Sequence, residues 1–160
     1  MDEAHWMAEA LALAEEAGAA GEIPVGAVIV DRHGVIIGRG RNRRESGDPL
    51  GHAELIAIAE AAQSIGDWRL EGTTMVVTLE PCAMCAGALV NARVAKLIFG
   101  ASDPKAGFCG TLGNLVQDVR LNHRLEVVSG VAAEESRRLL QEFFQGLRKR
   151  SQVTERWQSG

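Results

Sequence analysis

The sequence predicts an α/β fold, in which a mixed sheet of five strands lies between helices on both of its faces. From residue 73 onward, segments with strand composition alternate with segments of helical periodicity. That alternation is typical of parallel strands joined by helices. Earlier in the chain, two strand-like segments are separated by a short turn, and such a hairpin joins antiparallel strands. Together these two observations predict a three-layer α/β/α architecture.

The first predicted elements are a helix and a hairpin. Apolar residues recur at helical spacing over residues 6–17, and the glycines that follow end this helix. Segments rich in Val and Ile predict strands at residues 23–31 and 35–40, with a hairpin turn at residues 32–34. An arginine-rich loop follows this second strand.

A second helix is expected to begin near residue 48 and to end at Gly66. Asp48 is the type of residue that caps a helix, and Pro49 suits the first helical position. We expect an apolar stripe of this helix to face the core, formed by Leu55, Ile58, Ala59 and Ala62.

The remaining elements alternate along the second half of the chain. They are strands at residues 73–79, 94–99 and 125–128, helices at residues 83–90 and 132–150, and a Gly-rich loop at residues 100–113. The last helix is expected to face the core with Leu139, Leu140, Phe143, Phe144 and Leu147. We expect residues 1–150 to form a single domain and residues 151–160, which lack periodicity, to form a flexible tail.

The composition is that of an ordinary globular domain. The chain has 160 residues, of which 46% are apolar and 24% are charged, and this excludes a chain that is disordered throughout. Its apolar stretches are all shorter than the about 20 residues of a membrane helix. The acidic start Met-Asp-Glu is unlike the basic start of a secretion signal, so we expect a cytoplasmic protein.

The charge is distributed unevenly, although the net charge of −4 does not by itself favour a nucleic-acid partner. Residues 1–22 contain six acids and no Lys or Arg, residues 39–44 contain four arginines and no acid, and residues 137–150 contain five basic residues and one acid. Local basic patches decide whether phosphates are attracted. Solvated surface is the alternative interpretation of these clusters.

His52 and the pair Cys82-x-x-Cys85 are spaced like metal ligands. The two cysteines share one face at the start of a helix, where the helix dipole and free N–H groups lower the pKa of a thiol. One imidazole and two thiolates suit zinc. Three protein ligands leave the fourth tetrahedral position for water, whose pKa on zinc falls to about 7. Cys109, the remaining cysteine, lies in a loop without a partner at a recognisable spacing.

Glu54 lies two residues after His52, which is near enough to reach a water molecule on the metal. A carboxylate there suits a proton shuttle. A redox Cys-x-x-Cys and a purely structural zinc site are the alternatives. The first lacks an aromatic residue before Cys82, and the second lacks a fourth ligand. A zinc-stabilised RNA-binding module without catalysis is a further alternative.

These residues lie in segments that resemble the bacterial tRNA-specific adenosine deaminases, a family with the cytidine deaminase-like fold. The segments follow one another in the family's order from about residue 4 to residue 150. They are Glu22-Ile-Pro-Val-Gly-Ala-Val, His52-Ala-Glu, Thr78-Leu-Glu-Pro-Cys-Ala-Met-Cys-Ala-Gly-Ala, Phe99-Gly-Ala-Ser-Asp-Pro-Lys-Ala-Gly, Asn122-His-Arg and Phe143-Phe144. The resemblance implies a homodimer, one zinc ion (Zn²⁺) per subunit, and hydrolytic conversion of adenosine to inosine at the wobble position of an arginine tRNA anticodon.

The resemblance also implies a role for each matching residue. His52, Cys82 and Cys85 hold the zinc ion, and Glu54 transfers protons. The target base and its nucleotide are contacted by Asn42, the backbone of Ala53, the loop at residues 101–107 with Asp103, and Phe144 at the rim of the pocket. The RNA backbone is contacted by Arg43, Arg44, Lys105, Arg148, Lys149 and Arg150.

A deaminase of a free nucleobase, such as guanine or cytosine, is the alternative function, because it uses the same zinc centre. The arginine-rich loop and the basic end of the last helix favour RNA, since an enzyme for a free base needs neither. The chain has no Tyr, which disfavours stacking of bases on a sheet. A single flipped base in a pocket needs fewer aromatic residues.

Overall fold

A mixed five-stranded sheet forms the centre of the molecule, as predicted. The computed structural model describes the backbone of residues 2–158 and the side chains of residues 2–151. The strands are β1 (Gly26–Val30), β2 (Ile36–Arg41), β3 (Thr74–Leu79), β4 (Lys96–Ala101) and β5 (Glu126–Val128), in the spatial order β2-β1-β3-β4-β5. The pairs β1–β2 and β1–β3 are antiparallel, whereas β3–β4 and β4–β5 are parallel. The prediction of a hairpin followed by parallel strands is therefore confirmed.

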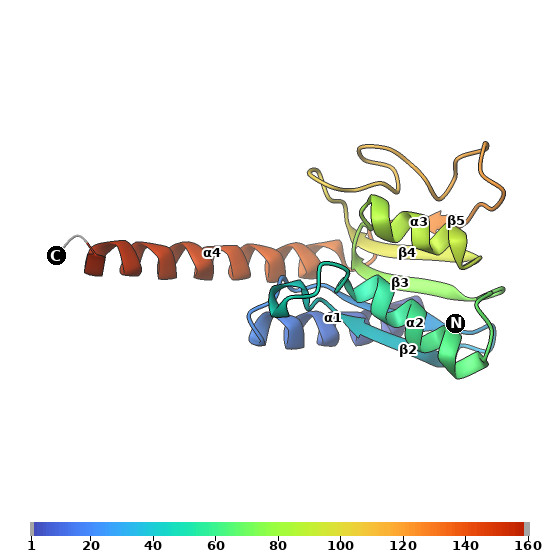
Figure 1. The fold of residues 1–160 in the computed structure, drawn as a ribbon, viewed down its shortest axis with the longest axis horizontal. Coiled ribbons are helices and arrows are strands. Elements are labelled where there is room, and N and C mark those ends of the chain that lie inside the picture. Colours follow the sequence, from blue (N-terminus) through green and yellow to red (C-terminus); the bar gives the residue numbers. More distant parts are fainter. Residues whose placement is uncertain (1, 159–160) are drawn as a thin grey trace.

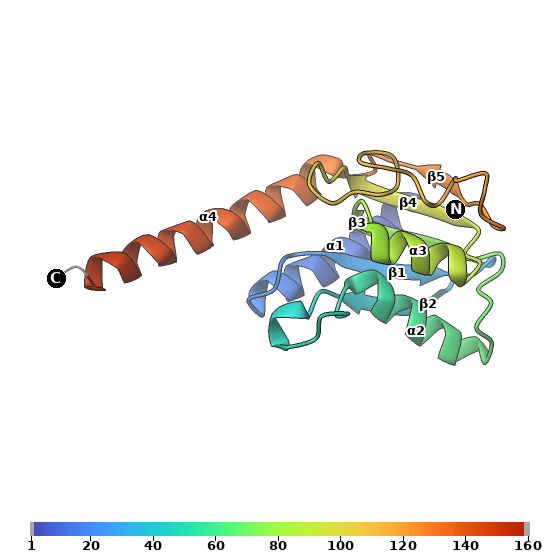
Figure 2. The same cartoon turned by 45° about the horizontal axis from the view of Figure 1, so that its top comes forward.

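Helices cover both faces of this sheet (Figures 1 and 2). On one face, α1 (Glu3–Ala19) and the start of α4 (Ala133–Gln158) pack on the strands, with Met7 and Ala10 of α1 buried against Val28, Val76 and Ile98. On the other face, α2 (Ala53–Ile65) and α3 (Ala83–Asn91) lie side by side over a larger apolar core. Within the described residues, the helices are all too short or too polar to span a membrane.

The start and the buried face of α2 differ from the prediction. The helix begins at Ala53 with His52 as its N-cap, and the Asp48 side chain instead accepts a hydrogen bond from the Leu50 amide, 3.0 Å away. This local turn uses the carboxylate that would have capped a helix. His52 has extended backbone angles, so the chain enters the helix only after it.

Small residues form the centre of the buried face of α2, and two residues of the predicted stripe, Ile58 and Ala62, pack on the core beside them. The fully buried alanines are Ala53, Ala57 and Ala61, whereas Ala59 is exposed and the other predicted residues are half-buried. The cause lies on β2, where Gly38 and Gly40 bring the strand close to the helix. A Cβ atom added to Gly38 would lie 2.2 Å from the Ala57 carbonyl oxygen. Only alanines fit between two backbones at this separation.

Helix α4 projects away from the sheet, which also differs from the prediction (Figure 1). Its first turns pack on the body, where the buried Ser136 hydroxyl donates to the Thr78 carbonyl, 2.6 Å away. Farther along, Phe144 and Leu147 are about 40% exposed, since the body ends before the helix does. The helix also continues to Gln158, past the predicted boundary at residue 150.

Candidate active site

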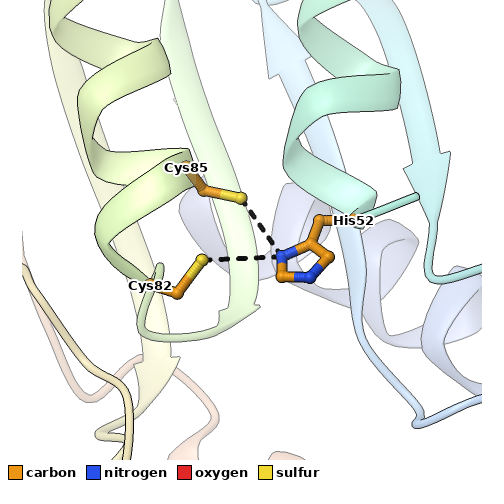
Figure 3. A group of neighbouring side chains, drawn as sticks. All are labelled: His52, Cys82 and Cys85. Atoms are coloured by element: carbon orange, nitrogen blue, oxygen red, sulfur yellow. Dashed lines mark hydrogen bonds between the residues drawn. The ribbon is translucent and has the colours of Figure 1, made fainter. Parts of the chain in front are cut away.

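Two helix N-termini meet at one edge of the sheet and bring three metal-binding side chains together. His52 is the N-cap of α2, Cys82 is the N-cap of α3, and Cys85 lies in the first turn of α3. Because both helices cover the same face of the sheet, their first residues face each other (Figure 3). The three residues that the sequence predicts as ligands are thus neighbours in the structure.

The geometry of this cluster fits a metal ion. His52 Nδ1 lies 3.5 Å from Cys82 Sγ and 3.4 Å from Cys85 Sγ, and the three ligand atoms all lie within 4.8 Å of one another. One imidazole nitrogen and two sulfurs form a donor set that suits zinc. Among the residues that the structure describes, no other His, Cys, Asp or Glu joins this group. Three protein ligands are the number found in catalytic rather than structural zinc sites.

The two thiols differ in acidity, although the sequence predicted that the helix start would lower the pKa of both. A hydrogen bond from the Cys85 thiol, together with the backbone amides of Cys85 and Met84, lowers the pKa of Cys82 to about 5. The same hydrogen bond, together with burial, raises the pKa of Cys85. In the metal-free chain, the thiol of Cys85 therefore stabilises the thiolate of Cys82, and a metal ion would replace the shared proton.

Glu54 lies in the first turn of α2, on the same cleft as the metal cluster. Its side chain is only 4% exposed, and this burial raises the pKa of the carboxyl group from 4.5 to about 7. The negative charge of Cys82 raises it further, whereas the neighbouring His52 lowers it. A carboxyl group with a pKa near neutrality is suited to accept and return a proton.

A cleft of about 150 Å³ opens beside the cluster. Of the residues predicted to contact the substrate or the RNA backbone, Asn42, Arg44 and Asp103 line it, whereas Ala53 is fully buried and does not line it. No hydrogen bond joins the side chain of Asn42 to another described residue, so its amide is available to a ligand. Arg43 lies outside this lining, and its Nε atom is 3.4 Å from Asp48 Oδ2.

A second hollow, of about 670 Å³, lies beside the projecting part of α4. Lys105, Phe144 and Arg148 line it together with Leu140 and Leu147. The structure therefore separates these three residues from the metal cluster, although the loop that carries Asp103 and Lys105 borders both hollows. Lys149 and Arg150 lie at the next positions of α4 and are exposed.

Sequence reasoning missed part of the cleft wall. The apolar residues Ile23, Val25 and Leu79 line it, and so does Glu80, which is only 2% exposed. The pairing of the strands is the signal that could have identified these residues. Because β1 runs antiparallel to β3, the residues before β1 and those after β3 meet at the same edge of the sheet.

Comparison with known proteins identifies the family. The MafB19-like deaminase family matches residues 1–148. The chain is 52% identical over 149 residues to a tRNA-specific adenosine deaminase of Bacillus subtilis, with 92% of each chain covered. It is 49% identical over 148 residues to a tRNA-specific adenosine deaminase of Haemophilus influenzae, covering 92% of this chain and 86% of the relative. The chain belongs to the tRNA-specific adenosine deaminase family.

A solved structure from this family agrees with the fold described above. It comes from a study of A-to-I editing by tRNA:A34 deaminases at the wobble position of transfer RNA, and it superposes with a TM-score of 0.81 at 42% sequence identity. The match covers 85% of this chain and 99% of that chain. Family membership confirms the resemblance seen in the sequence and the assignment of the protein as a deaminase enzyme.

Proposed function

We propose that this deaminase converts adenosine to inosine at the wobble position of an arginine tRNA anticodon, with one zinc ion held by His52, Cys82 and Cys85. The observation that carries the proposal is the metal cluster with the buried Glu54 on the same cleft. The names of the relatives support tRNA as the substrate. The arginine tRNA follows from the resemblance in the sequence.

The reaction is a hydrolysis in which Glu54 transfers the protons. Zinc, when bound, would make a water molecule nucleophilic at neutral pH. The Glu54 carboxylate takes a proton from this water and gives it to N1 of the adenine ring while the oxygen attacks C6. A second transfer through Glu54 protonates the amino group, the C6–N6 bond breaks, and ammonia leaves. The water oxygen becomes the carbonyl oxygen of inosine.

The cleft holds the target nucleotide through polar and apolar residues of its lining. The free side-chain amide of Asn42 donates and accepts hydrogen bonds with the base, whereas the contact that the resemblance implies for the backbone of Ala53 is not open, because Ala53 is fully buried. Asp103, from the loop that follows β4, lines the same cleft. The apolar side chains of Ile23, Val25 and Leu79 pack on the ring faces of the base, which must leave its stack to enter.

Neighbouring nucleotides follow the surface from the cleft toward α4. Phe144 is 41% exposed in the second hollow, where an aromatic ring stacks on a base that flanks the target. Lys105 and Arg148 border the same hollow and are positioned to neutralise phosphates. Arg44 adds positive charge in the lining of the cleft, and the exposed Arg43, Lys149 and Arg150 carry further positive charge.

We further propose that the protein is a cytoplasmic homodimer. The outer side of α3 carries small residues, with Ala83 exposed and Gly87 and Ala88 half-buried, so a second copy can approach this helix closely. Sedimentation of the purified protein tests the assembly. A species with the mass of two chains is expected, and a monomer at all concentrations would exclude the homodimer.

Inosine detection in a tRNA tests the function directly. Zinc-loaded protein is incubated with an arginine tRNA transcript whose wobble residue is adenosine, and with a matched transcript that carries guanosine there. Inosine is expected at that one position of the first transcript only. Free guanine and cytosine are assayed in parallel, and turnover of a free base without turnover of tRNA would favour the alternative function.

A further inference from the structure

Glu80 is a buried carboxylate that the proposed reaction does not use. It directly follows β3, and its backbone amide donates to the Ala101 carbonyl at the end of β4, 2.8 Å away. Its side chain contacts the loop that follows β4, at residues 102–111. Only 2% of Glu80 is exposed, so the carboxylate needs partners within the protein.

Four donors, all from this one loop, satisfy the Glu80 carboxylate. Oε1 accepts from the Asp103 amide, 3.0 Å away, and from the Thr111 hydroxyl. Oε2 accepts from the amides of Cys109 and Thr111, at 3.0 and 3.1 Å. Burial raises the pKa of Glu80, but the hydrogen bonds from Thr111 and the loop amides outweigh it and hold the pKa below its usual range.

The loop packs tightly against the Glu80 side chain. A Cβ atom added to Gly107 would lie 2.3 Å from the carboxyl carbon of Glu80, so only glycine fits at this position. Gly107 also pairs with Cys82 in an isolated β-bridge, and the Phe108 amide donates to the Pro81 carbonyl, 2.9 Å away. The loop is therefore held against the segment that carries the first cysteine of the metal cluster.

We infer that Glu80 is a positioning residue for the substrate, because it fixes the loop that forms one wall of the cleft. Asp103 and Ala106 line the cleft, and Lys105 lines the second hollow, so a shift of this loop moves three contacts with the RNA at once. The inference rests on the proposed function, in which these surfaces hold the target nucleotide and its neighbours.

The variant Glu80→Gln tests this role, because it keeps the volume but replaces one acceptor oxygen with an NH₂ group. The amide oxygen can still accept from Cys109 and Thr111, whereas the NH₂ group then faces the Asp103 amide, which is also a donor. We expect KM for an anticodon stem-loop to rise about tenfold or more, with a smaller change in kcat. Bound zinc is expected to stay at one per chain.

Hydrogen–deuterium exchange provides a readout that does not depend on activity. In Glu80→Gln, the amide of Asp103 is expected to exchange faster than in the wild type, while amides in α2 and β3 remain unchanged. Glu126→Gln is the matched control, since it removes the same charge from an exposed position on β5. A general electrostatic effect on RNA binding would appear equally in both variants.

Thr111 provides a second pair of variants should Glu80→Gln fold poorly. Thr111→Val removes one donor to Glu80 and is expected to raise KM. Thr111→Ser keeps the hydroxyl, so its KM is expected to stay close to that of the wild type. A merely structural role would reduce the amount of active enzyme, and hence kcat, without changing KM. If the wild type deaminates the stem-loop and KM is unchanged in Glu80→Gln and Thr111→Val, the positioning role is excluded. If the wild type does not deaminate RNA, it is the proposed function that fails.

Discussion

Glu54 combines deep burial with a position on the metal-binding cleft, and burial is what raises its pKa to about 7. His52 and the two cysteines surround a common point from two helix starts. At the scale of single residues, the site therefore separates two tasks. Three side chains can hold an ion, and a fourth, with its own environment, can move protons.

Replacing Glu54 with Gln is expected to abolish catalysis while the metal stays bound. The amide occupies the same volume but cannot accept a proton from water, so kcat should fall by about 10²-fold or more. Inosine formation and zinc content are measured on the same preparation. Full activity of Glu54→Gln would exclude the deamination mechanism, and loss of zinc would make Glu54 a ligand instead of a proton carrier.

Replacing Cys82 or Cys85 with Ala is expected to remove the metal. Bound zinc should fall from one ion per chain to nearly none, and the melting temperature should fall by about 4 °C or more, because the ion stabilises the folded state. Cys109→Ala is the matched control, since this cysteine is buried outside the cluster. Zinc content that survives in Cys82→Ala would contradict the ligand assignment.

The raised pKa of Glu54 predicts how the stability of the metal-free protein depends on pH. Between pH 4.5 and 7 the folded protein holds a proton that the unfolded chain releases, so the free energy of unfolding falls as pH rises through this window. In Glu54→Gln this loss is absent. The free energy of unfolding of the variant, minus that of the wild type, should therefore increase by about 3 kcal/mol as the pH rises from about 4 to about 8. Denaturant titrations of chelator-treated proteins measure this difference, and a constant difference would contradict it.

At the scale of elements, the contact between α2 and β2 sets the position of His52. The alanines of α2 lie against Gly38 and Gly40, and this close approach holds the start of the helix beside α3. The predicted stripe was right for Ile58 and Ala62, which pack on the core, and wrong for Ala59, which is exposed. Apolar spacing alone does not show which small residues meet the glycines of the strand. The separation of the two backbones, rather than hydrophobicity, decides which residue fits.

Gly38→Ala is expected to destabilise the protein by about 3 kcal/mol, because the new methyl group would collide with the Ala57 carbonyl. Gly146→Ala in α4 is the control. Its new methyl group would make only an ordinary contact, 3.8 Å from Arg150, and should stabilise the helix by about 0.5–1 kcal/mol. Thermal unfolding of both variants checks the difference in sign. If Gly38→Ala and Gly146→Ala changed the stability equally, α2 would be free to move away from β2 to accommodate the new methyl group.

At the scale of the whole molecule, the acidic and basic segments lie on different elements. The six acids of residues 1–22 belong mostly to α1, on the face of the sheet opposite α2 and α3. Arg44 lines the cleft, and Lys105 and Arg148 line the hollow beside α4. The net charge of −4 therefore conceals a basic surface around the site.

The double variant Arg43→Ala, Arg44→Ala is expected to weaken tRNA binding and to flatten its dependence on salt. The slope of log K against log salt is negative, and each lost phosphate contact makes it less steep by about 0.7 to 0.9. Arg69→Ala is the control, since Arg69 stacks on Trp68 just beyond the C-terminal end of α2, whereas His52 lies at its start. Titrations at several salt concentrations measure the slope, and an unchanged slope would remove the two arginines from the interface.

The sequence by itself determined the order of the elements, the mixed sheet and the family. Strand and helix periods are local properties, and the segments around His52 and Cys82 are specific enough to identify a deaminase. It also predicted the three candidate ligands and Glu54, because the chemistry of their side chains can be read without knowing their positions, and the structure brings the three candidate ligands together. The assignment of residues 1–150 as a domain and residues 151–160 as a flexible tail stays a prediction.

Only the tertiary structure decided where α2 begins, that α4 leaves the body, and that Arg44 lines the cleft whereas Lys105 and Arg148 line the second hollow. It also revealed the four donors that surround Glu80. These features depend on which backbones approach each other across the sheet. Residues 23–31 apart, such as Glu80 with Asp103 and Thr111, become partners only because β3 and β4 end at the same edge.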